Sequence, residues 1–262
     1  MLSLIPISDV NPTRRFPIVT VALIAANVVV FFTEPGLGIS DEATGFFYEH
    51  APVPCQLVDK CPAASLIPDY NSLELVWAMI VSTFLHGGIL HIAGNMLFLW
   101  VFGNNIEDHL GRGKFLTFYL LGGLAASLAH ILWSLRDLPP TPPPLEACFA
   151  GVVSCGPYVP AVGASGAVAA VMGAYILLYP KARVNVLVPI FIIWTVVQMS
   201  ALAVLGIWFV YQFLIGAQEL SGATEVAWMA HVGGFVFGVA AILVLGGRPH
   251  PSQPHWEPDW RY

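Results

Sequence analysis

Charged side chains are scarce in this chain. They occupy 10% of its 262 positions, whereas soluble domains average about 25%. Hydrophobic residues make up 57% of the sequence, and the mean hydropathy is +0.74. This balance excludes an ordinary soluble domain and predicts an integral membrane protein whose surroundings are the lipid bilayer. The sequence also lacks any long basic tract, so nucleic acid is not expected as a partner.

Apolar runs near the length of about 20 residues that a helix needs to cross a bilayer occur at six places. They cover 16–33, 84–102, 115–135, 161–179, 195–217 and 226–246. No small-residue cleavage site follows the first run, so we expect it to be retained as a span. We expect the residues from Val184 onward to form a segment at the membrane interface that leads into the fifth span. Pro189 is expected to mark the point where this segment meets the helix. The sequence therefore predicts an all-α membrane protein with a polar N-terminal segment (1–15), a six-span domain (16–247) and a polar tail (248–262).

The positions of lysine and arginine predict the orientation, because cytoplasmic loops carry an excess of them. With six spans, eight basic residues fall on the side of the two termini: Arg14, Arg15, Arg112, Lys114, Lys181, Arg183, Arg248 and Arg261. Only Lys60 and Arg136 fall on the other side. We therefore expect both termini in the cytoplasm of a multi-pass protein of the cell membrane.

Cysteine is also rare, and its four copies all fall in the two loops expected on the outer face. Cys55 and Cys61 lie in the first loop, and Cys148 and Cys155 lie in the second. This placement favours disulfide bonds in an oxidising compartment. Four cysteines allow three connectivities, of which pairing within each loop is the simplest, and free thiols are the alternative.

Polar side chains inside membrane spans are costly and therefore call for a reason. Four of them converge on one depth near the outer face although they come from three different runs. His91 and Asn95 belong to the second run, Ser165 to the fourth and His231 to the sixth. This shared depth predicts a functional site.

Small residues favour close packing of the fourth and sixth runs. They form a stripe on each helix: Ser165, Ala169 and Gly173 on one, and Gly234 and Gly238 beside His231 on the other. Close helix packing is by itself the commoner reason for a sequence such as GASG at 163–166. A nucleophile with small neighbours is the other explanation, and facing stripes would bring Ser165 to His231.

Serine beside histidine supplies a nucleophile and a general base. The side chains of Asn95 and His91 can donate hydrogen bonds to a developing oxyanion. No carboxylate is available at this depth, so we expect a Ser–His dyad. A metal site built from His86, His91 and His231 is not expected, since no cysteine or acidic residue completes the ligand set.

Three motifs in this arrangement resemble those of rhomboid intramembrane serine proteases. They are HGGILHIAGNM at 86–96, GASG at 163–166, and AHVGG at 230–234 followed by Gly238. The resemblance implies a six-helix bundle in which Ser165 is the nucleophile and His231 its base. It implies oxyanion donors from Asn95, His91 and the backbone N–H groups of Ser165 and Ala164. It also implies single-span membrane proteins as substrates, cleavage at the outer side of the bilayer, and no cofactor or metal.

Two positions depart from the family pattern. Many rhomboids carry an aromatic residue one turn after the nucleophile, where this chain has Ala169. A Trp-Arg pair often anchors the first outer loop, but here Trp77 is followed by Ala78. The alternative function is a catalytically inactive relative that binds transmembrane helices. A channel or transporter is less favoured, because no span has an acidic residue at its middle.

Overall fold

The computed structural model describes residues 5–62, 67–141, 156–190, 193–219 and 227–245. The chain is mostly helical, as expected. The helices are α1 (Ile18–Thr33), α2 (Asp41–His50), α3 (Ser72–Ser82), α4 (Ile89–Leu110), α5 (Arg112–Ser134), α7 (Ser165–Leu178), α8 (Ala201–Glu219) and α9 (Trp228–Val244). The strands are β1 (Ile5–Asp9), β2 (Arg183–Ile190) and β3 (Ile193–Ser200). The expected C-terminal tail at 248–262 lies outside the described residues.

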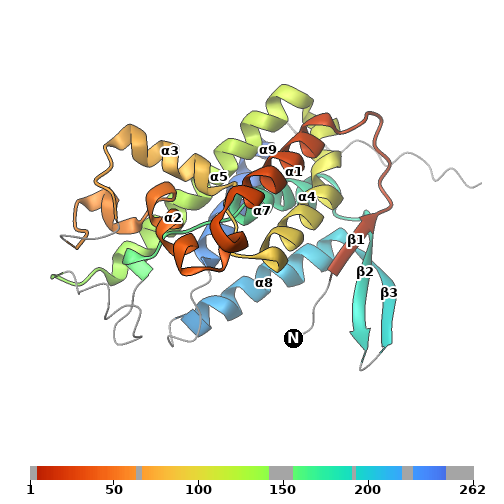
Figure 1. Ribbon diagram of the computed structural model, residues 1–262. Coiled ribbons are helices and arrows are strands. Elements are labelled where there is room, and N and C mark those ends of the chain that lie inside the picture. The colour runs from red at the N-terminus through yellow and green to blue at the C-terminus, as the bar shows by residue number, and fades with distance from the viewer. Residues whose placement is uncertain (1–4, 63–66, 142–155, 191–192, 220–226, 246–262) are drawn as a thin grey trace, which may run out of the picture.

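Helix α7 is the centre of the bundle and packs against α4, α5, α8 and α9 (Figure 1). Every residue from Gly166 to Tyr175 is buried, so this part of the helix has no polar face. A helix that is apolar all round is typical of one surrounded by other helices or by lipid. The largest cluster of buried residues accordingly joins α7 to α1, α4, α5, α8, α9 and β2.

Helices occupy all six apolar runs of the sequence, but they differ in length. By length and composition, the described segments Ile89–Leu110 and Arg112–Asp137 are able to cross a membrane. The other four are shorter apolar helices in their described parts: Ile18–Thr33, Ser165–Leu178, Ala201–Leu214 and Trp228–Val244. The mostly helical architecture is therefore confirmed, while the prediction that the chain crosses the membrane six times stays a prediction.

The expected start of the fifth span is wrong. Residues before Ala201 form strands β2 and β3 of an antiparallel hairpin, so Thr195 and Pro189 lie in strands. β-Branched side chains dominate this segment, and they favour extended backbone over helix. Pro189 is therefore part of a strand and does not mark the join between an interfacial segment and a helix.

The expected start of the second span is also wrong. Helix α4 begins at Ile89, and His86 and Gly87 lie in the turn between α3 and α4. Gly88 has a φ of 125°, which other residues rarely adopt. The two glycines of the HGG sequence thus belong to a tight turn that presents His91 in the first turn of the helix.

The N-terminal segment joins the bundle through a three-stranded sheet. Strand β1 pairs antiparallel with β2, which pairs with β3. Asp9 at the end of β1 accepts hydrogen bonds from the Tyr175 hydroxyl at 2.6 Å and the Asn105 amide at 2.8 Å. These contacts link β1 to α7 and α4 at the end of α7 that is opposite Ser165.

Burial raises the pKa of the Asp9 carboxyl from 3.8 to about 6. Between about pH 4 and 6 the folded protein then holds a proton at Asp9 that the unfolded chain has lost, so stability falls as the pH rises through this range. We expect wild type to gain stability relative to Asp9→Asn when the pH is lowered from 7 to 4. Thermal unfolding of both proteins in detergent measures the difference. An Asp9→Asn curve parallel to that of wild type over this range would contradict the prediction.

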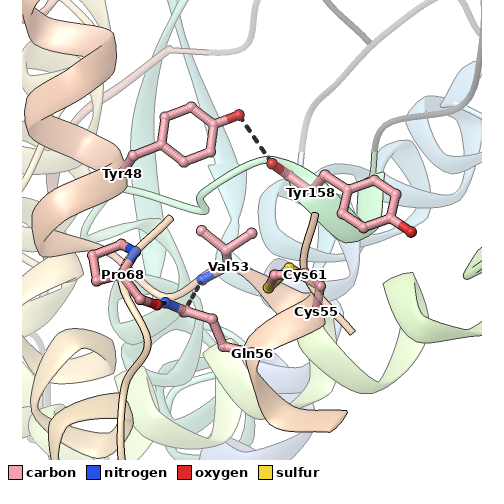
Figure 2. The surroundings of a disulfide bond; sticks show 7 residues. All are labelled: Tyr48, Val53, Cys55, Gln56, Cys61, Pro68 and Tyr158. Carbon is pink, nitrogen blue, oxygen red and sulfur yellow. Dashed lines mark hydrogen bonds between the residues drawn. A yellow bond between two sulfur atoms is a disulfide. The ribbon is translucent and has the colours of Figure 1, made fainter. Parts of the chain in front are cut away.

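The loop between α1 and α3 contains a disulfide bond between Cys55 and Cys61, which confirms the pairing expected there (Figure 2). Nearby, the Tyr48 hydroxyl donates to the carbonyl of Tyr158 at 2.9 Å. The Gln56 side chain accepts from the Val53 N–H and donates to the Pro68 carbonyl, each at 2.8 Å. These bonds fold the loop on itself. Cys148 and Cys155 lie outside the described residues, so their pairing stays a prediction.

Replacing Cys55 and Cys61 by serine should lower the free energy of unfolding by about 2 kcal/mol, because the bond closes a short loop. Thermal unfolding with and without reductant measures the loss. Mass analysis after alkylation under non-reducing conditions provides the control, since it counts the free thiols before unfolding. Equal unfolding temperatures for the oxidised and reduced protein would contradict the prediction.

Candidate active site

Ser165 is the first residue of α7 and is partly exposed, while Ala164 and Gly166 on either side are buried. The first N–H groups of a helix have no partner within the helix and carry partial positive charge. Gly163 before it has a φ of 125° and donates its N–H to the Ser82 carbonyl at 2.9 Å. The turn thus presents the serine hydroxyl next to a set of backbone donors.

Helix α9 lies against α7 with main-chain atoms in direct contact. A Cβ atom built on Gly234 would lie 2.1 Å from the Gly166 carbonyl oxygen, and one on Gly238 would lie 1.9 Å from that of Ala170. In return, a Cβ on Gly173 would lie 2.1 Å from the carbonyl oxygen of Phe235. Only glycine permits this approach, which is the close packing that small residues allow in membranes.

The contacting row on α7 differs from the expected one in part. Gly173 lies in it, but the other members are Gly166 and Ala170, each one residue after the expected Ser165 and Ala169. Ala169 is fully buried. This offset leaves the Ser165 side chain beside the contact row rather than underneath the neighbouring helix.

Ser165 and His231 lie within hydrogen-bonding distance. The Oγ of Ser165 is 2.9 Å from Nε2 of His231, which stands in the first turn of α9. Both residues are partly exposed. A serine hydroxyl that donates to an imidazole nitrogen is the arrangement that general-base activation requires.

The other side of the His231 ring is held by α8, which the sequence reasoning did not identify. Oε1 of Gln212 lies 2.7 Å from Nδ1 of His231, and the Gln212 Nε2 donates to the Trp208 carbonyl at 3.1 Å. The indole of Trp208 lies beside the imidazole, with ring centroids 5.8 Å apart. An aromatic neighbour is therefore present although position 169 is alanine. A glutamine one turn after a tryptophan in an apolar run is the feature of the sequence that could have indicated this contact with His231.

The expected oxyanion donors lie on α4. Nδ1 of His91 accepts the Gly87 N–H at 3.3 Å, so the hydrogen of the neutral ring is on Nε2. That Nε2 faces Gly163. A Cβ atom built on Gly163 would lie 2.7 Å from the His91 Nε2 and 3.7 Å from the Ser165 Oγ. Asn95, one turn later, is buried, and its Nδ2 has no hydrogen-bond partner among the described residues. A buried amide donor without a partner is suited to receiving an oxygen from a ligand.

Two further buried histidines, His130 and His86, lie in the described part of the chain. His130 lies in α5 and is 8% exposed. Within the described ranges, no three histidine, cysteine or acidic side chains lie close enough together to hold a metal ion. The rings of His86 and His91 are in edge contact at 5.2 Å, which positions one histidine against the other.

The segment that follows α1 is attached to the turn before α4 by Glu34 rather than through Trp77. The Glu34 side chain is buried and accepts the His86 N–H at 2.9 Å. Trp77, in contrast, is 65% exposed. The bond to Glu34 joins the end of α1 to the turn that leads into His91.

Comparison with known proteins identifies the family of this chain. Residues 74–248 match the family model of the rhomboid domain. The human presenilin-associated rhomboid-like protein, mitochondrial, is 28% identical over 162 residues, which are 62% of this chain and 36% of that protein. RHOMBOID-like protein 4 of Arabidopsis thaliana is 26% identical over 66% of this chain and 35% of its own length. The rhomboid protease GluP of Bacillus subtilis is 31% identical over 65% of this chain and 26% of its own length.

The matched part of this chain therefore spans about a quarter to a third of the length of these relatives. The human relative is named as mitochondrial, whereas GluP is bacterial. Their names thus give no support to the expected cell membrane as the location. Membership of a family of integral membrane proteins nevertheless agrees with the scarcity of charge in the sequence. Because the family model covers more than half of the chain, the protein belongs to the rhomboid family.

Proposed function

We propose that this protein is an intramembrane serine endopeptidase. The observation that carries the proposal is the distance of 2.9 Å between Ser165 Oγ and His231 Nε2. Membership of the rhomboid family and the name of the bacterial relative, a rhomboid protease, support the same activity.

In the proposed reaction, the Ser165 hydroxyl attacks the carbonyl carbon of a substrate peptide bond. His231 Nε2 takes the hydroxyl proton and later gives it to the leaving amine. Water then attacks the acyl-enzyme, with His231 again acting as the base. The two steps release both peptide fragments and return the serine to its free state.

Hydrogen-bond donors for the oxyanion would come from two helices. Asn95 and His91 supply side-chain donors from α4, and the N–H of Ser165 supplies a donor from the start of α7, with that of Ala164 beside it. Donors that are already in place cost no reorganisation when charge develops, and this stabilisation usually lowers the activation barrier more than any other single effect.

The proposed substrates are single-span membrane proteins. A peptide bond inside a membrane helix is hydrogen-bonded internally and shielded from water, so it must be unwound before hydrolysis. Helix-breaking residues near the outer membrane boundary would lower this cost. Six spans, with both termini on the side that is rich in lysine and arginine, would place Ser165 near the outer face.

Labelling of Ser165 tests the nucleophile. The solubilised protein is treated with a fluorophosphonate probe, and the adduct is located by peptide mass analysis. We expect one adduct, on the peptide that contains Ser165, and none on heat-denatured protein. A single-span model substrate with a glycine or proline near its outer boundary should be cut there, as fragment mass would show. No adduct together with no cleavage would favour a relative that binds transmembrane helices without cutting them.

A further inference from the structure

His231 has a second polar partner in addition to Ser165. Gln212 comes from the middle of α8, a helix that contributes no other group to the proposed chemistry, and its side chain is 2% exposed. Its Oε1 lies 2.7 Å from the Nδ1 of His231. A buried amide has to satisfy its donors and acceptors, because leaving one unpaired costs free energy. The position of Gln212 is therefore specified by its partners.

The backbone of α8 fixes which way the Gln212 amide points. Its Nε2 donates to the carbonyl of Trp208, one turn earlier, at 3.1 Å. If the amide were flipped, its oxygen would face that carbonyl oxygen and its NH₂ group would face His231. Only the first orientation gives the Trp208 carbonyl a donor, so the amide oxygen is the atom directed at the imidazole.

That orientation in turn determines the tautomer of His231. An amide oxygen only accepts hydrogen bonds, so Nδ1 must carry the hydrogen. In the neutral ring, Nε2 then has the free lone pair, and it is this nitrogen that lies 2.9 Å from the Ser165 hydroxyl. We propose that Gln212 is a positioning residue that holds His231 as the Nδ1–H tautomer with Nε2 directed at Ser165. The inference rests on the proposed function for its catalytic consequence.

The proton moves only on the serine side of the ring. When Ser165 attacks, its Oγ–H bond breaks, a bond from Oγ to the substrate carbon forms, and the proton goes to Nε2. The hydrogen on Nδ1 stays where it is and donates to Gln212 throughout. When the peptide bond breaks, the proton on Nε2 goes to the leaving nitrogen, and the ring returns to its starting tautomer.

A neutral amide suits this position better than a carboxylate would. A carboxylate buried in a membrane helix must be desolvated and then compensated by a positive charge. Trp208 adds a steric constraint: its indole lies 5.8 Å from the imidazole, and it stacks on Phe235 with centroids 6.3 Å apart. The ring of His231 is thus limited in rotation by an aromatic neighbour and oriented by the amide.

Replacing Gln212 by methionine, which has a similar shape and no amide, tests the proposal in the solubilised full chain. We expect kcat to fall by about 10²-fold, the lower end of what general-base catalysis contributes, with KM changed less than twofold. The unfolding temperature should fall by only about 2–4 °C, because the Nδ1–H of His231 loses its acceptor. Leu214→Met, a substitution at an exposed position on the same helix, is the matched control and should keep wild-type rates.

Gln212→Glu separates orientation from a merely structural role. The carboxylate still accepts from Nδ1–H, and its charge stabilises the protonated ring. Activity should therefore exceed that of Gln212→Met at high pH, and the acid limb of the kcat/KM profile should move to higher pH. A loss of activity in Gln212→Met that merely parallels a loss of stability, with no pH shift in Gln212→Glu, would overturn the proposal.

The tautomer can also be measured without activity. In protein labelled with ¹⁵N-histidine and carrying Ser165→Ala, the ring nitrogens of His231 should show hydrogen on Nδ1. The same spectrum of the Ser165→Ala, Gln212→Met protein should show a mixture of both tautomers. An unchanged spectrum would overturn the proposal even if the enzyme is active. A wild-type protein that cleaves nothing and is not labelled at Ser165 would instead overturn the proposed function, while this spectrum would still report on Gln212.

Discussion

Ser165→Ala should lower the rate of substrate cleavage by at least about 10⁴-fold, because it removes the oxygen that we propose attacks the substrate. His231→Ala should cause a loss of similar size, since the hydroxyl then has no base at 2.9 Å. The double variant should be no slower than either single variant. Residues that act as one unit lose their joint contribution when any one of them is removed. Cleavage of the single-span substrate under single-turnover conditions measures all three rates.

Matched controls separate this effect from misfolding. Ser72→Ala changes an exposed serine in the first turn of α3, and His50→Ala changes an exposed histidine in α2. Both should keep wild-type cleavage rates, and all variants should unfold near the wild-type temperature. The assignment of the nucleophile would be wrong if Ser165→Ala kept a tenth or more of the wild-type rate. Losses that multiply in the double variant would show that the two residues do not act on the same step.

Gly238→Ala should destabilise the protein by about 3 kcal/mol or more, because the added methyl group meets backbone. Its Cβ would lie 1.9 Å from the Ala170 carbonyl oxygen and 2.9 Å from the Ala170 Cα. The main chain in the middle of two packed helices cannot shift to make room for the methyl group at a low cost in free energy. Separation of α9 from α7 would also lengthen the distance between His231 and Ser165, so cleavage should fall together with the unfolding temperature.

Gly206→Ala in α8 is the matched control, since a Cβ built there meets no atom within 4 Å. In an open helical position, alanine is favoured over glycine by about 1 kcal/mol. The control should therefore be as stable as wild type or slightly more stable, with an unchanged cleavage rate. Thermal unfolding of both variants in the same detergent compares them directly. Equal unfolding temperatures for the two variants would show that α7 and α9 are not in main-chain contact.

Several elements of the fold could be predicted because their sequence patterns have one dominant cause. Long apolar runs have few alternatives to helix, and glycines at i and i+4 in such a run indicate close packing. The pairing of Cys55 with Cys61 is the simplest choice for two cysteines in one loop. The hairpin of β2 and β3 differs from the prediction because the apolar character of this segment indicates a helix, whereas its β-branched side chains favour a strand. Val184, Val186 and Val188 fit a strand and an apolar helix equally well on hydropathy alone.

The candidate site was predictable to the extent that its residues share one depth. The depth of a residue in the membrane follows from its position along a span. This depth alone predicts that Ser165 and His231 lie at the same level. Rotation of a helix about its own axis is a different coordinate, and it depends on packing. Gln212 was missed for this reason, since only the packing of α8 turns this side chain toward His231. The offset of the contact row on α7 has the same origin.

The pairing of His231 with a neutral amide has an electrical consequence. Moving one elementary charge across the whole bilayer changes its free energy by about 2.3 kcal/mol for each 100 mV of membrane potential. With Gln212 where a carboxylate could stand, Ser165, His231 and Gln212 together carry no formal charge before the reaction starts. The imidazolium and the oxyanion then form together as a short dipole. Cleavage in a sealed, polarised vesicle should therefore proceed at nearly the same rate at any membrane voltage.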